Sequence, residues 1–228
     1  MLKPFKLIFL SIILTTLFSS FIIMQTKKRV IFFGDSITQA GVKPGGYIDL
    51  LNSMLSSKGF DKNYQLEGAG IGGNKVYDLY LRMEEDVLMK KPDIVVVYIG
   101  VNDVWHKQSS GTGTDADKFD KFYLAIIKKL KQANIKIAIC TPAVIGERTD
   151  FSNQLDGDLN KYSNAIRNIA KFENLPLIDL RSAFLQFNIS NNSNNKESGI
   201  LTSDRVHLND AGNKLVAEEM WKVISGIK

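Results

Sequence analysis

The sequence contains very little cysteine and histidine. Its 228 residues include one cysteine, Cys140, and two histidines, His106 and His207. A single thiol cannot form an internal disulfide, and it excludes a zinc or iron–sulfur centre built from several cysteines. Two histidines leave too few ligands for a histidine-rich metal site. We therefore expect no metal centre and no disulfide framework.

Acidic residues are missing from the first 29 positions, which hold five basic residues. Removing those five from the 29 basic residues of the chain leaves 24 basic against 24 acidic residues. The rest of the chain is therefore formally neutral, although the net charge is +5. This distribution argues against a basic surface for nucleic acid. Hydrophobic residues at 44% and charged residues at 23% are typical of a globular domain.

An apolar run at 7–24 dominates the N-terminus. At about 1.5 Å per residue, a helix of this length would be roughly 27 Å long, close to the hydrocarbon thickness of a bilayer. No small-x-small cleavage site precedes Lys27, so the pattern favours an uncleaved anchor over a cleaved signal peptide. We expect a signal or anchor segment at 1–28 and one exported domain at 29–228, in the cell envelope or periplasm. Lysines flank the run on both sides, which leaves its orientation open.

Short apolar runs alternate with amphipathic patterns through the rest of the chain. The apolar runs predict strands at 29–33, 64–67, 94–99, 136–140 and 177–178. Apolar spacings of three and four predict helices at 47–58, 76–89, 115–134, 159–173 and 210–227. This alternation predicts an α/β domain with a parallel sheet between two helical layers. Polar stretches at 109–113 and 188–198 are predicted as loops, either mobile surface or the border of a site.

Polar residues follow the predicted strands at several points. Ser36 follows the first strand, Asn102 follows the third, and His207 lies in the loop before the last helix. Ligands of open parallel sheets bind beyond the carboxyl ends of the strands, so we expect these residues to converge. A serine hydroxyl becomes a nucleophile when a histidine removes its proton and a carboxylate orients the imidazole ring. Asp204 precedes His207 by three residues, a spacing that suits the carboxylate.

A second histidine–carboxylate pair has the same spacing, because Asp103 precedes His106 by three residues. We favour His207 as the base, since we expect Asp103 in the turn that presents Asn102. Attack on a carbonyl creates an oxyanion that needs fixed N–H donors. The glycine-rich stretch 67–74 and the amide of Asn102 are candidates for these donors.

In order and rough spacing, four blocks resemble the SGNH hydrolases, also called the GDSL esterase/lipase superfamily. The blocks are Gly34–Asp35–Ser36–Ile37, residues 70–74, Gly100–Val101–Asn102–Asp103 and Asp204–Arg205–Val206–His207. The resemblance implies a three-layer α/β/α, flavodoxin-like fold with five parallel strands in the order 2-1-3-4-5. It also implies a serine hydrolase of carboxylic esters that uses no metal or other cofactor.

Carried over by position, the resemblance implies that Ser36 is the nucleophile, His207 the general base and then acid, and Asp204 its partner. Trp105 and His106 follow the third block directly. They are candidates for lining the substrate cleft, with simple packing or surface exposure as the alternative.

The resemblance further implies an oxyanion hole made by the N–H groups of Ser36 and Gly73 and the side chain of Asn102. The family often has asparagine two residues before the Gly-Ile of its glycine block, and this chain has Gly68 there. The choice between Gly72 and Gly73 therefore stays open, although the spacing fits Gly73 better. We expect Asp35 and Asp103 to bond nearby backbone rather than to react.

These observations leave three candidate functions. The first is an esterase that removes short acyl groups, such as acetyl, from a carbohydrate or similar small substrate. The second is a lysophospholipase or acyl-thioesterase at the membrane, which the apolar run at 7–24 would suit. The third is a non-catalytic glycan-binding module. That reading requires a broken triad, whereas Ser36, Asp204 and His207 are all present. The expected partner is an ester substrate rather than nucleic acid, and the sequence does not indicate an oligomeric state.

Overall fold

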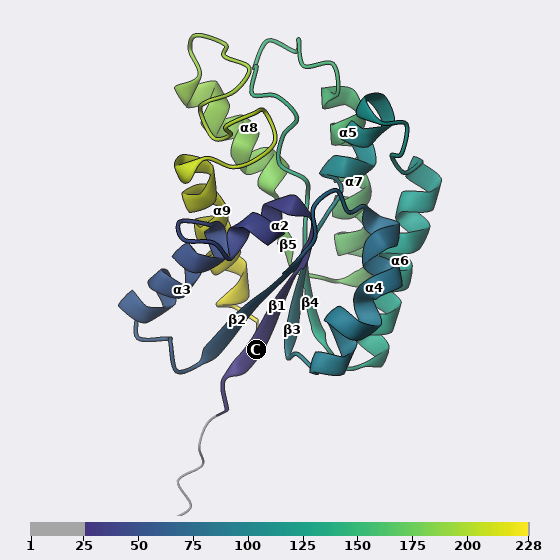
Figure 1. The fold of residues 1–228 in the computed structure, drawn as a ribbon, viewed down its shortest axis with the longest axis vertical. Coiled ribbons are helices and arrows are strands. Elements are labelled where there is room, and N and C mark those ends of the chain that lie inside the picture. Colours follow the sequence, from purple (N-terminus) through teal and green to yellow (C-terminus); the bar gives the residue numbers. More distant parts are fainter. Residues whose placement is uncertain (1–25, 228) are drawn as a thin grey trace, which may run out of the picture.

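A five-stranded parallel sheet forms the centre of the molecule (Figure 1). The computed structural model describes residues 26–227, and the apolar run at 7–24 lies outside the described residues. The strands follow the spatial order β2-β1-β3-β4-β5, which confirms the order expected from the sequence. Their bounds are β1 Lys28–Gly34, β2 Tyr64–Gly70, β3 Ile94–Tyr98, β4 Lys136–Cys140 and β5 Leu177–Ile178.

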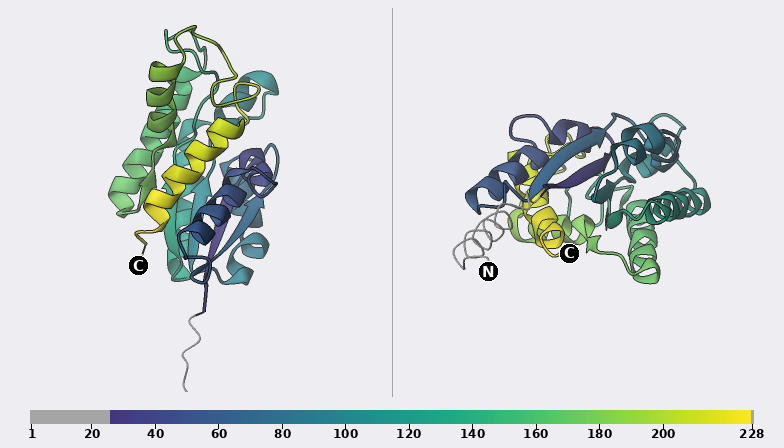
Figure 2. Two further views of the ribbon diagram at one scale, coloured as in Figure 1. Left: turned by 90° about the vertical axis from the view of Figure 1, so that its left-hand side faces the viewer. Right: turned by 90° about the horizontal axis from the view of Figure 1, so that it is seen from below.

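Helices cover both faces of this sheet, so the fold has three layers (Figures 1 and 2). One layer contains α3 (Tyr47–Ser57) and α9 (Asp210–Ile224), which pack on each other. The other contains α4 (Val76–Asp86), α6 (Ala116–Gln132) and α7 (Asp156–Glu173). The predicted α/β/α architecture is confirmed. Within residues 26–227, no helix is long and apolar enough to span a membrane.

The core lies along the two central strands. Every residue of β3 is buried, and Val30 to Phe33 of β1 are fully buried as well. Helices on both faces leave these strands no side toward water, which explains why their sequences are continuous apolar runs rather than alternating ones. The sheet is therefore a rigid base whose strand ends can hold functional groups in place.

Three helices were not predicted from the sequence. They are α2 (Ser36–Gly41), α5 (Val101–Ser109) and α8 (Leu180–Asn191). The expectation that Asp103 lies in a turn was wrong, because it lies in the first turn of α5. The loop expected from position 188 begins only after Asn191. Helices α2 and α5 have only 6 and 9 residues, and α8 has a weak apolar stripe, so periodicity did not reveal them.

Helix ends differ from the expected bounds by a few residues. The expected helix at 76–89 ends at Asp86 and is followed by a short 3₁₀ turn, η1 (Leu88–Lys90). The expected helix at 115–134 is α6, which begins at Ala116 and ends at Gln132. Such shifts are usual, because helix ends depend on local capping more than on periodicity.

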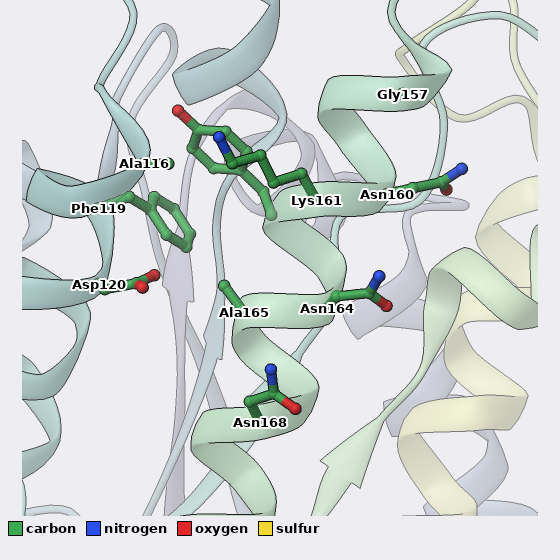
Figure 3. A pocket seen from close by; sticks show the side chains of 10 residues that line it. Ala116, Phe119, Asp120, Gly157, Asn160, Lys161, Asn164, Ala165 and Asn168 are labelled. Atoms are coloured by element: carbon green, nitrogen blue, oxygen red, sulfur yellow. The ribbon is translucent and has the colours of Figure 1, made fainter.

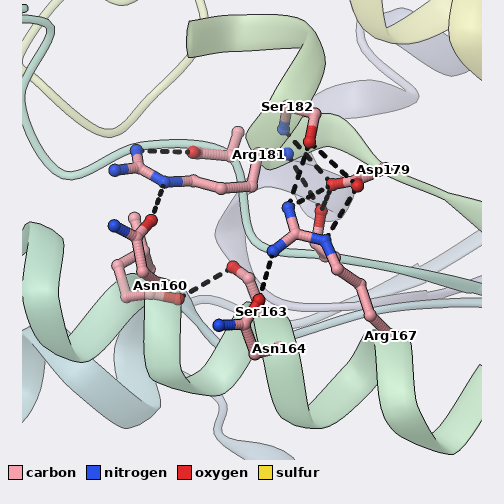
Figure 4. A network of polar contacts seen from close by, with 10 residues as sticks. Asn160, Ser163, Asn164, Arg167, Asp179, Arg181 and Ser182 are labelled. Carbon is pink, nitrogen blue, oxygen red and sulfur yellow. Dashed lines mark hydrogen bonds and ion pairs between the residues drawn. The ribbon is translucent and has the colours of Figure 1, made fainter.

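A buried polar network joins α7, α8 and the segment after β4 (Figure 4). Arg181 is 4% exposed, and its guanidinium donates to Asn160, to the Ala143 carbonyl and to Asp156. Because an unpaired buried charge is costly, these bonds fix the segment after β4 against the two helices. That segment lies beyond the carboxyl ends of the strands, beside the candidate site.

Candidate active site

Ser36 lies directly beyond the carboxyl end of β1, as the first residue of α2. Asp35 caps this helix, and its side chain accepts the N–H of Ile37 at 3.0 Å. The turn requires a glycine at position 34, since a Cβ there would lie 2.4 Å from the Tyr98 carbonyl oxygen. Gly34 therefore lets β1 and β3 lie close together at the point where the chain turns into α2.

His207 and Asp204 meet Ser36 from a loop 171 positions further along the chain. The Ser36 Oγ lies 3.0 Å from His207 Nε2, and His207 Nδ1 lies 2.7 Å from Asp204 Oδ2. An ionised carboxylate can only accept hydrogen bonds, so the ring proton belongs on Nδ1. Nε2 is then free to accept the serine proton. The three residues that the sequence predicted as a triad thus form one unbroken hydrogen-bond series.

Asp204 is held in its ionised form by its own loop. Burial acts to raise its pKa, but hydrogen bonds from the backbone and ring of His207 and from the Val206 N–H outweigh it, and the pKa falls below its usual range. Its Oδ1 accepts the N–H of His207 at 2.8 Å and the N–H of Val206 at 3.1 Å. A charged Asp204 stabilises the imidazolium that forms when His207 takes up a proton.

Glu147 anchors the loop that carries Asp204 and His207, and sequence reasoning missed it. Its carboxylate is 1% exposed and accepts the N–H groups of Ile200, Leu201 and Thr202 at 2.6 to 2.8 Å. The sequence did contain a signal for it, because Glu147 directly follows the uncharged and mostly apolar stretch 141–146. A lone carboxylate in such a stretch needs buried donors.

The glycine-rich loop after β2 lies next to Ser36. A Cβ on Gly72 would be 3.9 Å from the Ser36 Cβ, so this loop borders the serine directly. The Gly72 N–H donates to Gln39 Oε1 at 3.0 Å. Gly73 has φ +76°, a left-handed conformation that favours glycine. Within the described part of the chain, its N–H donates to no protein acceptor, which favours Gly73 over Gly72 as a donor to a ligand.

Asn102 is held beside this loop by a chain of polar contacts. Asn102 is 2% exposed, and its Nδ2 donates to the Asn74 carbonyl at 3.1 Å, which leaves its second amide hydrogen available. Arg82 Nε donates to Asn74 Oδ1 at 2.7 Å, and its Nη2 donates to the carbonyls of Gly34 and Ala69. The arginine therefore ties the glycine-rich loop to the ends of β1 and β2.

Two buried carboxylates lie behind Ser36. Burial raises the pKa of Asp35 to about 7, and the nearby Asp103 carboxylate adds to this rise. Burial likewise raises the pKa of Asp103 to about 6, against the hydrogen bond that it accepts from the Val76 N–H. Both groups bond backbone at the start of a helix, in agreement with the structural role expected for them.

These pKa shifts predict how stability depends on pH. Above about pH 4 the unfolded chain loses the proton of Asp35, whereas the folded protein keeps it to about pH 7. The contribution of Asp35 to stability is therefore complete below pH 4 and is lost as the pH rises through 7. We expect Asp35→Asn, which keeps the cap acceptor, to gain roughly 4 kcal/mol in free energy of unfolding relative to wild type between pH 4 and 8. Urea unfolding at both pH values measures this difference.

The matched control for this comparison is the exposed Asp61, changed to Asn. Its difference from wild type should be the same at both pH values. If Asp35→Asn and wild type lose stability in parallel from pH 4 to 8, the raised pKa of Asp35 is wrong.

Trp105 and His106 both border the site. The Trp105 ring centroid lies 6.5 Å from that of His207, at an interplanar angle of 71°. A side chain at Gly73 would come within 3.8 Å of His106 Cε1. Burial and the charge of Lys75 lower the pKa of His106, which favours its neutral form. The structure thus places Trp105 beside His207 and His106 beside the glycine-rich loop, and their role in binding substrate stays a prediction.

A groove of about 470 Å³ between α6 and α7 is separate from this site (Figure 3). Asp120 reaches into it from α6, and Asn164 and Asn168 border it on α7. None of the site residues predicted from the sequence lines this groove. Among residues 26–227, no cluster of three or more histidine, cysteine or acidic side chains is arranged to hold a metal ion.

A three-layer α/β/α fold with serine, histidine and carboxylate in hydrogen-bonding series beyond the strand ends is characteristic of a serine hydrolase. A model of the GDSL-like Lipase/Acylhydrolase family matches residues 32–215, and the chain belongs to this family. The resemblance to SGNH hydrolases is thereby confirmed, and the protein is a serine hydrolase of carboxylic esters.

Several relatives are acetylxylan esterases. The crystal structure of the acetyl xylan esterase AlAXEase is 63% identical, with a TM-score of 0.85, and covers 87% of this chain and 100% of that one. The acetylxylan esterase of Geobacillus stearothermophilus is 27% identical over 213 residues, which are 86% of this chain and 94% of the relative. Solved structures of an acetylxylan esterase from that organism, Axe2, include one serine-to-alanine and one histidine-to-alanine variant, both described as catalytic mutants.

Proposed function

We propose that this protein removes acetyl groups from a carbohydrate, with saccharides derived from xylan as its substrate class. The hydrogen-bond series from Ser36 through His207 to Asp204 is the observation that carries the proposal. The similarity to AlAXEase, at 63% identity over that whole chain, supports the acetyl group and the sugar. The esterase activity belongs to the family, whereas this substrate is our proposal.

In the proposed first step, His207 Nε2 accepts the proton of the Ser36 hydroxyl as Oγ attacks the acetyl carbonyl carbon. The 3.0 Å separation of Oγ and Nε2 suits a direct transfer. A bond forms between Oγ and carbon, and the carbonyl electron pair moves to oxygen. Asp204, 2.7 Å from Nδ1, stabilises the resulting imidazolium.

The oxyanion then needs donors that are already in place. The proposed donors are the N–H groups of Ser36 and Gly73 and the free amide hydrogen of Asn102. Ser36 is the first residue of α2, where backbone N–H groups have no partner within the helix. Because Arg82 and Asn74 hold the loop and the amide in position, little reorganisation is required as charge develops.

Collapse of this intermediate expels the sugar. The oxyanion re-forms the carbonyl, the bond between carbon and sugar oxygen breaks, and His207 gives its proton to that oxygen. Water then attacks the acetyl-Ser36 ester with His207 again as base, and collapse releases acetic acid and the free serine. The cycle consumes one water and returns every residue to its starting form.

A substrate panel tests this proposal against the lysophospholipase and thioesterase alternatives. A longer acyl chain gains about 0.8 kcal/mol per CH₂ only where apolar surface covers it. Of the residues that border the site, the glycines and Asn102 have no apolar side chain that could cover a longer acyl chain. We expect kcat/KM for p-nitrophenyl acetate to exceed that for the octanoate by at least about tenfold, and acetylated xylo-oligosaccharides to release acetate.

The same panel includes a lysophospholipid and an acyl thioester. Preference for octanoate or for either of these substrates over the acetylated sugar would contradict the proposal and favour the membrane alternatives. Absence of turnover on every ester would instead favour the non-catalytic glycan-binding module.

A further inference from the structure

A small polar cavity of about 180 Å³ lies beside the catalytic loop. Its walls come from the end of α5, from the segment between β4 and α7, and from the loop that carries Asp204 and His207. Its polar lining is formed largely by Gln108, Arg148, Asn153, Gln154, Glu197 and Arg205. Three segments that are far apart in the sequence therefore enclose one pocket.

Two elements contribute residues to the cavity and to the surroundings of Ser36. Arg205 lines the cavity and stands two residues before His207, so their Cα atoms are at most about 7 Å apart. Gln108 also lines it and lies one helical turn after Trp105, on the same face of α5. The Trp105 ring packs against the ring of His207. The catalytic loop and α5 therefore border both the Ser36 site and the cavity.

The cavity contains two kinds of polar group: guanidinium groups held by ion pairs with Glu197, and amides that can bind a ligand. Glu197 bonds Arg205 at 2.8 Å and Arg148 at 3.6 Å, which neutralises part of their charge and holds both guanidinium groups. The amides of Gln108 and Gln154 bond no other group in the described part of the chain, and both residues are exposed. Each amide offers two donors and an acceptor.

This chemistry suits a sugar ring. Sugar hydroxyls both donate and accept hydrogen bonds. An amide can meet both demands, and a guanidinium can donate to the hydroxyl oxygens. An acyl chain would gain nothing from such a lining, and displacing water from these polar groups without replacing its hydrogen bonds would cost affinity. The cavity volume of about 180 Å³ leaves room for a single small ring.

We propose that this cavity is a subsite for the sugar unit next to the acetylated one, with Gln108 and Gln154 as its specificity-determining residues. The inference rests on the proposed deacetylation of a carbohydrate and extends it from a single sugar to an oligosaccharide. The glycan runs from Ser36 past Trp105, and its neighbouring ring bonds the two amides.

The test compares three acetate esters on the double variant Gln108→Ala/Gln154→Ala. The esters are p-nitrophenyl acetate, an acetylated methyl xyloside and an acetylated xylo-oligosaccharide. Loss of two hydrogen bonds predicts a fall of about tenfold in kcat/KM for the oligosaccharide alone. The other two esters do not reach the cavity, so their kcat/KM should stay within about twofold of wild type.

Gln132→Ala is the matched control, because Gln132 is an exposed glutamine at the end of α6, near the start of β4 and away from the site. It should leave all three rates unchanged. An unchanged oligosaccharide rate in the double variant overturns the subsite, and so does an equal loss on all three esters. Wild-type turnover of p-nitrophenyl acetate without turnover of either acetylated sugar overturns the proposed function itself, and the subsite with it.

Discussion

Changing Ser36 to alanine is expected to lower kcat for p-nitrophenyl acetate by roughly 10⁵-fold or more, because the change removes the hydroxyl that is the proposed nucleophile. The fold should survive. The hydroxyl lies at the edge of the sheet, and the change removes its 3.0 Å hydrogen bond to His207. A bond of this kind contributes about 1 kcal/mol, equivalent to a shift of roughly 2 to 4 °C in Tm. Initial rates and a thermal melt measure both quantities.

Non-additivity gives this experiment a second readout. When two residues act as one catalytic unit, removing both lowers kcat little more than removing one. The double variant Ser36→Ala/His207→Ala should therefore be about as slow as either single variant. The control is Ser56→Ala, an exposed serine in α3, which should keep full activity. Turnover within tenfold of wild type in Ser36→Ala would show that Ser36 is not the nucleophile.

The second large effect on kcat is expected when the amide of Asn102 is removed. We expect Asn102→Ala to lower kcat by about 10²- to 10³-fold, the usual loss when one oxyanion donor is removed. KM should change little, because in the proposed mechanism the amide stabilises charge that develops only in the transition state. Steady-state kinetics on p-nitrophenyl acetate separate the two constants.

A structural role for Asn102 would give a different pattern. Its hydrogen bond to the Asn74 carbonyl is also lost, which costs about 1 kcal/mol of stability. The control is Asn168→Ala, which makes the same substitution at an exposed position of α7. A loss of kcat below tenfold, or a rise in KM with kcat unchanged, would contradict the proposed oxyanion hole.

The strands were predicted well because a strand that is buried on both faces has a continuous apolar sequence. Lys136–Cys140 matched β4 residue for residue, and the run at 94–99 matched β3 to within one residue. The four motif blocks could also be found, because each stands just after a strand or in the loop before α9, where the backbone needs glycine and polar residues. Their order and spacing indicated the family before any contact was known.

Supporting residues were harder to predict. Glu147 and Arg82 act through backbone groups that are distant in the chain, and neither belongs to a motif block. Asp103 was misplaced because Asn-Asp after a strand resembles a turn, whereas its carboxylate bonds the N–H of Val76, the first residue of α4. Nothing in local periodicity indicates such a partner. The polar cavity beside Arg205 could not be predicted either, because three segments that are far apart in the sequence form it.

By itself, then, the sequence determined the order of the strands, the positions of five of the helices, the family and the candidates for the reacting side chains. These depend on local patterns of apolar residues and on short blocks that can be compared along the chain. Tertiary structure alone decided that Ser36 and His207, 171 positions apart, lie within hydrogen-bonding distance. It also decided that, within the described residues, the N–H of Gly73 rather than that of Gly72 has no protein acceptor. Finally, it buried the carboxylates of Asp35 and Asp103 near each other. Distances, free donors and burial result from packing between distant segments, and no local pattern records them.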